Sequence, residues 1–171
     1  MKNVSNITKG GILTALSVIA LYISSLLPTN KIAVLVILAL IIPISIIWTN
    51  IKTALIIYIS TSILGVLLIG LRGSVISYII LFGTYGFFKL LIEKLKNLYL
   101  EIPLKIIYFN IALTLIYFII SKFIIDITTL KFKLPMTVLV IGANIVFLIS
   151  DFVISLLIQE LNDKYLKKLK F

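Results

Sequence analysis

The residues of this chain that are able to do chemistry are few, and the most informative is an acid within an apolar stretch. Residues 136–160 are apolar almost throughout, yet they include Asp151. On a helix Asp151 belongs to one polar stripe. The other members of the stripe are Thr137, Asn144, Ser155 and Gln159. A charge at the centre of a membrane helix costs about 2.5–3.5 kcal/mol on the insertion scale. We therefore expect this face to turn toward protein or a water-filled cavity, and Asp151 to serve in a structural ion pair or as a functional carboxylate.

Lys89 is the second charge within an apolar stretch, in residues 74–92. At about 1.5 Å of rise per residue, Lys89 and Asp151 lie at similar depths in their spans. A pair between them would lower the cost of both charges. We favour the alternative, in which Lys89 reaches the nearer membrane surface and meets Glu93 one helical turn further on.

Catalytic and metal-binding patterns are absent from the sequence. The chain has no cysteine and no histidine, which removes thiol catalysis, histidine general bases and the usual zinc sites. It also lacks the HExxH, GxSxG and Walker A motifs. We therefore expect no catalytic residues, no metal and no cofactor, and we predict that the protein is not an enzyme.

The composition indicates an integral membrane protein. Of the 171 residues, 61% are hydrophobic and only 13% are charged, whereas a soluble domain has about 45–50% apolar residues. The net charge of +10 comes from basic residues that lie mostly at the ends of the apolar stretches. This placement is typical of the positive-inside rule, so we expect membrane lipid rather than nucleic acid as the partner.

The apolar stretches predict an all-α fold, a single transmembrane domain containing a bundle of six transmembrane helices. The predicted spans are residues 10–27, 32–48, 53–71, 74–92, 106–125 and 136–160. Residues 93–105 mix charges with leucine and tyrosine, as an interfacial segment does, and residues 161–171 form a basic tail. With the N-terminus inside, eleven basic residues lie on the cytoplasmic side and five outside. This asymmetry favours cytoplasmic N- and C-termini.

Polar residues at helical spacing on the last three spans predict a shared interior. Lipid offers no hydrogen-bond partners, so polar helix faces tend to meet one another. A cavity open to the outside would be lined by residues in the outer half of these spans. The candidate substrate-binding residues are Tyr78, Thr114, Tyr117, Ser121 and Asn144. The alternative is a set of ordinary interhelical hydrogen bonds, each worth about 0.6 kcal/mol.

The first span carries small residues at a spacing that suits contact with a partner helix. Gly11 and Ala15 stand four residues apart, and small residues let another helix approach closely. They lie in the opening TKGGILTALSVIA of residues 8–20. With its size and six spans, the chain resembles the substrate-binding S components of energy-coupling-factor (ECF) transporters. In that family the small face of the first helix docks on a transmembrane coupling subunit, which works with two ATPases.

This resemblance implies an S-component-like fold in a bacterial cell (inner) membrane. It also implies the capture of a vitamin-like small molecule from outside, at a site built mainly from the last three helices. The rod-shape-determining scaffold proteins of the MreD type are similar in size and architecture, and they imply a non-catalytic membrane scaffold or assembly factor instead. A third hypothesis is an ion-coupled carrier that uses Asp151.

Overall fold

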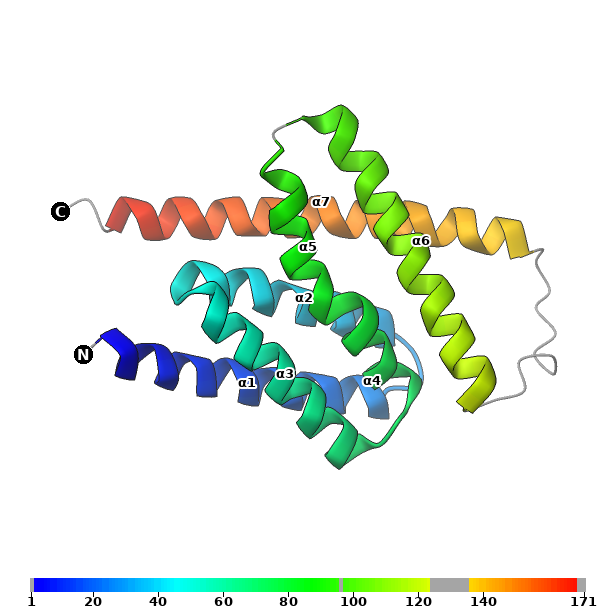
Figure 1. Ribbon diagram of the computed structural model, residues 1–171, viewed down its shortest axis with the longest axis horizontal. Helices are drawn as coiled ribbons and strands as arrows, with labels where there is room; N and C mark the ends of the chain where they lie inside the picture. Colours follow the sequence, from blue (N-terminus) through cyan, green and yellow to red (C-terminus); the bar gives the residue numbers. More distant parts are fainter. Residues whose placement is uncertain (1, 96, 124–135, 169–171) are drawn as a thin grey trace. The chain divides into compact units, whose positions relative to one another are not determined.

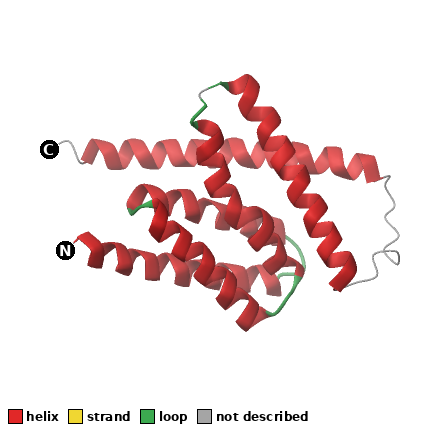
Figure 2. Ribbon diagram, viewed as in Figure 1, coloured by secondary structure: helices red, strands yellow, loops and turns green. Residues whose placement is uncertain are grey.

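The residues that the structure describes form six helical stretches that are long and apolar enough to cross a membrane. The computed structural model describes residues 2–95, 97–123 and 136–168, and every regular element among them is helical (Figure 2). The candidate membrane spans are Ser5–Leu26, Lys31–Trp48, Ile51–Ile69, Gly73–Glu93, Tyr99–Lys122 and Thr137–Glu160. Together with the apolar composition, these helices indicate a multi-pass membrane protein.

The helices are grouped in two compact units, Met1–Lys94 and Leu95–Phe171, whereas the sequence predicts one transmembrane domain. The elements of the first unit are α1 (Lys2–Leu26), α2 (Lys31–Trp48), α3 (Ile51–Ile69), α4 (Gly73–Ser77), the π-helical turn η1 (Tyr78–Phe82) and α5 (Gly83–Glu93) (Figure 1). The second unit contains α6 (Leu98–Phe123) and α7 (Met136–Lys168).

Two apolar clusters hold the first unit together. One is centred on Leu21, Leu38 and Tyr78, and the other on Ile42 and Ile57. Both clusters draw residues from α1, α2 and α3 or η1, so each helix contributes a stripe to a common core. The outward faces of the same helices carry exposed isoleucine and leucine, as expected where lipid rather than water covers the surface.

Short capped turns join the helices of this unit. The side chain of Asn50 accepts a hydrogen bond from the backbone N–H of Thr53 at 2.8 Å, which begins α3. Gly70 ends α3 with φ of 82°, a left-handed conformation that glycine adopts without strain. Helix α2 lies between α1 and α3 in the chain and runs antiparallel to both, so α1 and α3 are parallel (Figure 1).

The fourth span is interrupted by the π-helical turn η1, which the sequence does not predict. The backbone N–H of Gly83 bonds to the carbonyl of Tyr78, five residues back, so neighbouring carbonyls lose their usual partners. The hydroxyl of Tyr58 on α3 donates to the carbonyl of Ile79 at 2.9 Å, and Thr84 donates to the carbonyl of Ile80 at 2.7 Å. Side chains therefore satisfy the backbone groups that the wider turn releases.

We predict that Tyr58→Phe destabilises the fold by about 1–3 kcal/mol, because the carbonyl of Ile79 then loses a buried donor. Thermal unfolding in detergent measures the effect. Tyr22→Phe is the control, since Tyr22 is largely exposed on α1 and its variant is expected to unfold like the wild type. Equal stability of both variants would mean that the Tyr58 hydroxyl does not support the π-helical turn.

In the second unit, α6 begins earlier than the predicted fifth span. The predicted interfacial segment, residues 93–105, overlaps the first turns of α6, which starts at Leu98. The reason is a cap: the side chain of Asn97 accepts from the N–H of Tyr99 at 3.1 Å, and its carbonyl accepts from Glu101. Pro103 lies in the second turn, where it removes only one helical hydrogen bond. The last two residues of that span, 124 and 125, lie outside the described residues.

The predicted basic tail, residues 161–171, is helical over most of its length. Helix α7 continues through it to Lys168, and the last three residues lie outside the described part. A 33-residue helix is longer than the roughly 20 residues that cross a membrane. The end of α7 therefore extends past the apolar stretch.

Candidate functional site

The second unit is held by a ladder of paired side chains between α6 and α7, which cross in Figure 1. Three pairs follow one another with antiparallel register: Lys105 with Asp151, Phe109 with Phe147, and Asn110 with Asn144. On α6 the ladder covers little more than one turn, and on α7 it covers two. An ionic, an aromatic and an amide contact thus meet at one helix crossing.

Lys105 is the partner of the intramembrane acid. Its Nζ lies 2.8 Å from Oδ2 of Asp151, and both side chains are about nine-tenths buried. The face of α7 that carries Asp151 therefore turns toward protein. Each charge compensates for the loss of water around the other, and the hydrogen bond between them fixes their geometry. A carboxylate held this way is suited to joining two helices.

Asn110 and Asn144 form a reciprocal amide pair one to two turns from the ion pair. The amide nitrogen of Asn110 donates to Oδ1 of Asn144 at 2.9 Å, and that of Asn144 donates back at 3.2 Å. Each amide also donates to a carbonyl of its own helix, that of Ile106 or Val140. All four amide hydrogens are therefore used, which is what an amide needs where lipid offers no partners.

The buried face of α6 is different from the polar stripe that the sequence favours. The residues buried along α6 are Lys105, Phe109, Ala112 and Ile116, which recur every three or four positions. Asn110 lies at the edge of this face, and Thr114 and Tyr117 continue away from it as exposed residues. The hydroxyl of Thr114 donates to the carbonyl of Asn110 at 2.8 Å. Such a bond within its own helix lets a threonine remain outside the protein interior.

The candidate binding residues of the second unit therefore differ in their exposure and in their hydrogen bonds. Asn144 is engaged with Asn110, Ser121 is half-buried and donates to the carbonyl of Phe118, and Tyr117 is 49% exposed. The phenol of Tyr117 forms no hydrogen bond within the described residues. Whether these side chains line a ligand cavity stays a prediction.

Tyr78 and Lys89 belong to the first unit and are both buried. Tyr78 is 1% exposed and lies in the apolar core, with its ring 6.2 Å from that of Tyr58. Lys89 is fully buried, and its Nζ lies 2.7 Å from Oε1 of Glu93, the residue one turn further on. The Lys89 ammonium also lies 5.9 Å from the ring centre of Tyr85, within range of a cation–π contact.

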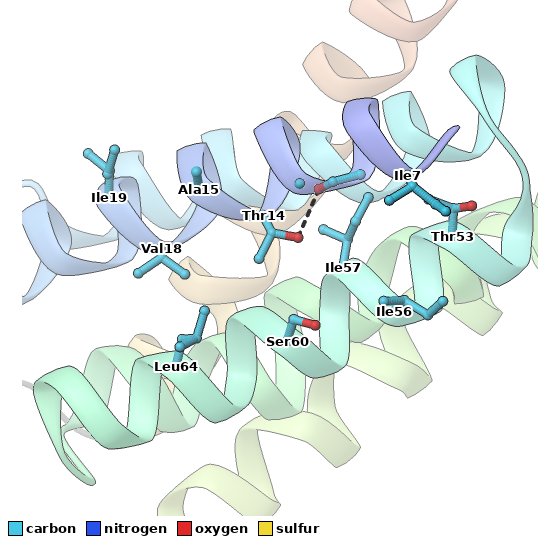
Figure 3. A pocket seen from close by; sticks show the side chains of 12 residues that line it. Ile7, Thr14, Ala15, Val18, Ile19, Thr53, Ile56, Ile57, Ser60 and Leu64 are labelled. Atoms are coloured by element: carbon cyan, nitrogen blue, oxygen red, sulfur yellow. Dashed lines mark hydrogen bonds between the residues drawn. The ribbon is translucent and has the colours of Figure 1, made fainter. Parts of the chain in front are cut away.

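Gly11 and Ala15, the predicted helix-contact residues, line an open groove between α1 and α3 (Figure 3). The groove has a volume of about 670 Å³ and largely apolar walls. Gly10 brings the two helices together, since a Cβ there would lie 3.0 Å from Thr53. A Cβ on Gly11 would meet nothing within 4 Å. The small residues of α1 thus face open space rather than a neighbouring helix of the first unit.

Sequence reasoning missed Lys105, which it placed at the membrane surface. The available signal was a helical stripe formed by Lys105, Phe109, Ala112 and Ile116. A lysine at the start of such a stripe is usually interpreted as the end of a membrane span. The described ranges contain no cluster of three or more potential metal ligands.

Comparisons with known proteins return no relative. No family model matches the chain, and neither the curated proteins nor the solved structures contain a match.

Proposed function

We propose that this chain is the substrate-binding subunit of an importer of the ECF type, and that it captures a small vitamin-like molecule from outside a bacterial cell. In this proposal it spans the inner membrane with both termini in the cytoplasm, and a coupling subunit with two ATPases supplies the energy. The chain itself performs no reaction. It presents the ligand, and its partner drives release.

The observation that carries the proposal is the exposed phenol of Tyr117, on the same helix as the locked amide of Asn110. Tyr117 lies two turns beyond Asn110 on α6. A phenol offers one donor, two acceptor lone pairs and a ring that stacks on planar ligands. The Lys105–Asp151 and Asn110–Asn144 side chains of the ladder are already satisfied by each other. We infer that the ladder fixes the helices, while Tyr117, Thr114 and Ser121 contact the ligand.

The first test is a gentle detergent pull-down of the tagged protein from its own membranes, with the co-purifying proteins identified. A coupling subunit accompanied by two ATPases is the expected result. Co-purification of cell-wall or shape-determining proteins instead would favour the scaffold hypothesis and contradict the importer.

We further expect Tyr117→Ala to weaken ligand binding by about tenfold to a hundredfold, the equivalent of one lost hydrogen bond and one lost stacking contact. A ligand-dependent melting screen with vitamin-class compounds finds the ligand and then compares the variants. Phe118→Ala is the matched control, because Phe118 is a similarly exposed aromatic residue on a different face of α6. If both variants bind the ligand as tightly as the wild type does, Tyr117 is not part of the site.

A further inference from the structure

The groove between α1 and α3 has the dimensions of one membrane leaflet. On α1 it runs from Ile7 to Ile19, and on α3 from Thr53 to Leu64, with Ile7 beside Thr53 at one end and Leu64 beside Val18 at the other (Figure 3). These ranges correspond to about 16–18 Å along a helix. The hydrocarbon core of a bilayer is about 30 Å thick, so one leaflet is about 15 Å. A partner transmembrane helix would need a groove that runs along the whole span, whereas this groove covers about half of it.

The walls of the groove suit a flexible hydrocarbon chain. The wall residues include Ile7, Val18, Ile56 and Leu64. The hydroxyl of Thr14 is turned back to the carbonyl of Gly10 at 2.9 Å (Figure 3), so it does not oppose an apolar occupant. The volume of about 670 Å³ falls within the range of about 300–1,000 Å³ that small-molecule sites occupy.

A basic residue, Lys52, lies at the end of this groove that the N-terminal ends of α1 and α3 form, where a lipid headgroup would be. Lys52, Ile56, Ser60 and Leu64 recur every four residues on α3, so Lys52 continues the stripe that forms the α3 wall. Lys52 is exposed, and it forms no ion pair with any residue that the structure describes.

No acidic residue of the same segment neutralises Lys52. Residues 1–92 contain six lysine or arginine residues and not one aspartate or glutamate. An anionic group from outside the chain would complement Lys52, whereas a zwitterionic headgroup would do so less well.

We propose that the α1–α3 groove binds one anionic phospholipid, with an acyl chain between the helices and the phosphate beside Lys52. The site lies in the leaflet that contains the N-terminal ends of α1 and α3. It takes an anionic diacyl lipid in preference to a zwitterionic one, and it is independent of whether the chain serves an importer.

The protein contains its own reporter for this site. Trp48 is the single tryptophan of the chain, and it packs on the cluster that contains Ile57, one of the groove residues. Lipids with brominated acyl chains quench tryptophan fluorescence on contact. The full chain is reconstituted in phosphatidylcholine vesicles in which brominated phosphatidylcholine or brominated phosphatidylglycerol is present at equal mole fraction.

We expect brominated phosphatidylglycerol to be preferred at Trp48 by about fivefold, the contribution of one lysine. Lys52→Gln is expected to reduce the preference about fivefold, and Lys52→Arg to retain it. Arg72→Gln is the matched control, because it removes one exposed charge at the opposite end of α3. Equal quenching by the two lipids in the wild type would overturn the proposal, as would an equal loss in the Arg72→Gln control.

Two further variants separate a lipid from a helix in the groove. Gly11→Leu fills open space in the groove and is expected to abolish the lipid preference, whereas Gly142→Leu on α7, where a Cβ also meets nothing within 4 Å, is expected to keep it. The chain has no cysteine, so Gly11→Cys gives a single reactive position. Disulfide-linked dimers of this variant in membranes would show a second copy in the groove and would overturn the lipid assignment.

Discussion

Replacing Asp151 with asparagine is expected to lower the free energy of unfolding by about 3–5 kcal/mol, the cost of leaving a buried charge without its partner. The ammonium of Lys105 lies 2.8 Å from the carboxylate, and its side chain is only 7% exposed. An amide cannot neutralise it, so the variant must either bury an uncompensated ammonium or separate α6 from α7. Denaturation in mild detergent measures the loss.

The double variant Lys105→Met/Asp151→Leu provides the decisive comparison. Removing both charges leaves apolar groups of similar size, and such replacements are often neutral or stabilising. We expect the double variant to recover most of the stability that Asp151→Asn loses. Ser150→Ala is the control on α7, because the Ser150 hydroxyl donates to the carbonyl of Val146 within its own helix. A double variant as unstable as the single one would contradict a simple ion pair.

The same variants test the carrier hypothesis. If Asp151 carries a proton or another cation through the membrane, transport fails whenever the carboxylate is absent, even in a stable protein. Full transport by Lys105→Met/Asp151→Leu would assign Asp151 to helix packing alone.

Gly86→Ala is expected to destabilise the first unit by about 1–3 kcal/mol, as overpacking of a filled core does. A Cβ on Gly86 would lie 2.7 Å from Cδ of Pro43 and 2.8 Å from Cβ of Ile42. The proline ring and the branched side chain are both stiff. Helices α2 and α5 must therefore move apart to accept one methyl group, and contacts along their whole interface weaken.

Gly142→Ala is the matched control for Gly86→Ala. Gly142 is also a helical glycine, but a Cβ there meets nothing within 4 Å. Alanine has the higher helix propensity, so this variant is expected to be as stable as the wild type or more stable by up to about 1 kcal/mol. Thermal unfolding of the two variants side by side distinguishes packing from propensity. Equal melting temperatures would mean that α2 and α5 are not in the close contact described.

The sequence identified the elements of this protein because a membrane span has a simple physical signature. A helix needs about 20 apolar residues to cross the hydrocarbon core, and six such stretches are visible in the chain. Their limits agree with the helices to within a few residues, apart from the starts of α1 and α6 and the far end of α7. Asn97 begins α6 early, because a cap depends on one residue rather than on hydropathy.

The candidate site was predictable only in part. The cost of a charge in lipid is a local property, so the sequence alone indicated that Asp151 would be sheltered. Its partner, Lys105, is 46 positions away. Lys105 lies next to the end of a predicted span, a position where lysines commonly face water. The polar stripe of α6 was a poor guide to the buried face, because Thr114 satisfies its hydroxyl within its own helix.

The sequence by itself therefore determined the class of the protein, the number of spans and the residues that lipid would penalise, since each follows from the solvation of one segment. Only the tertiary structure decided which groups pair, where α1 and α3 leave a groove, and that the fourth span contains a π-helical turn. In that turn the carbonyl of Ile79 accepts from the hydroxyl of Tyr58, which lies 21 residues away in the chain. Pairings of this kind are set by the distance between helices, which no single segment encodes.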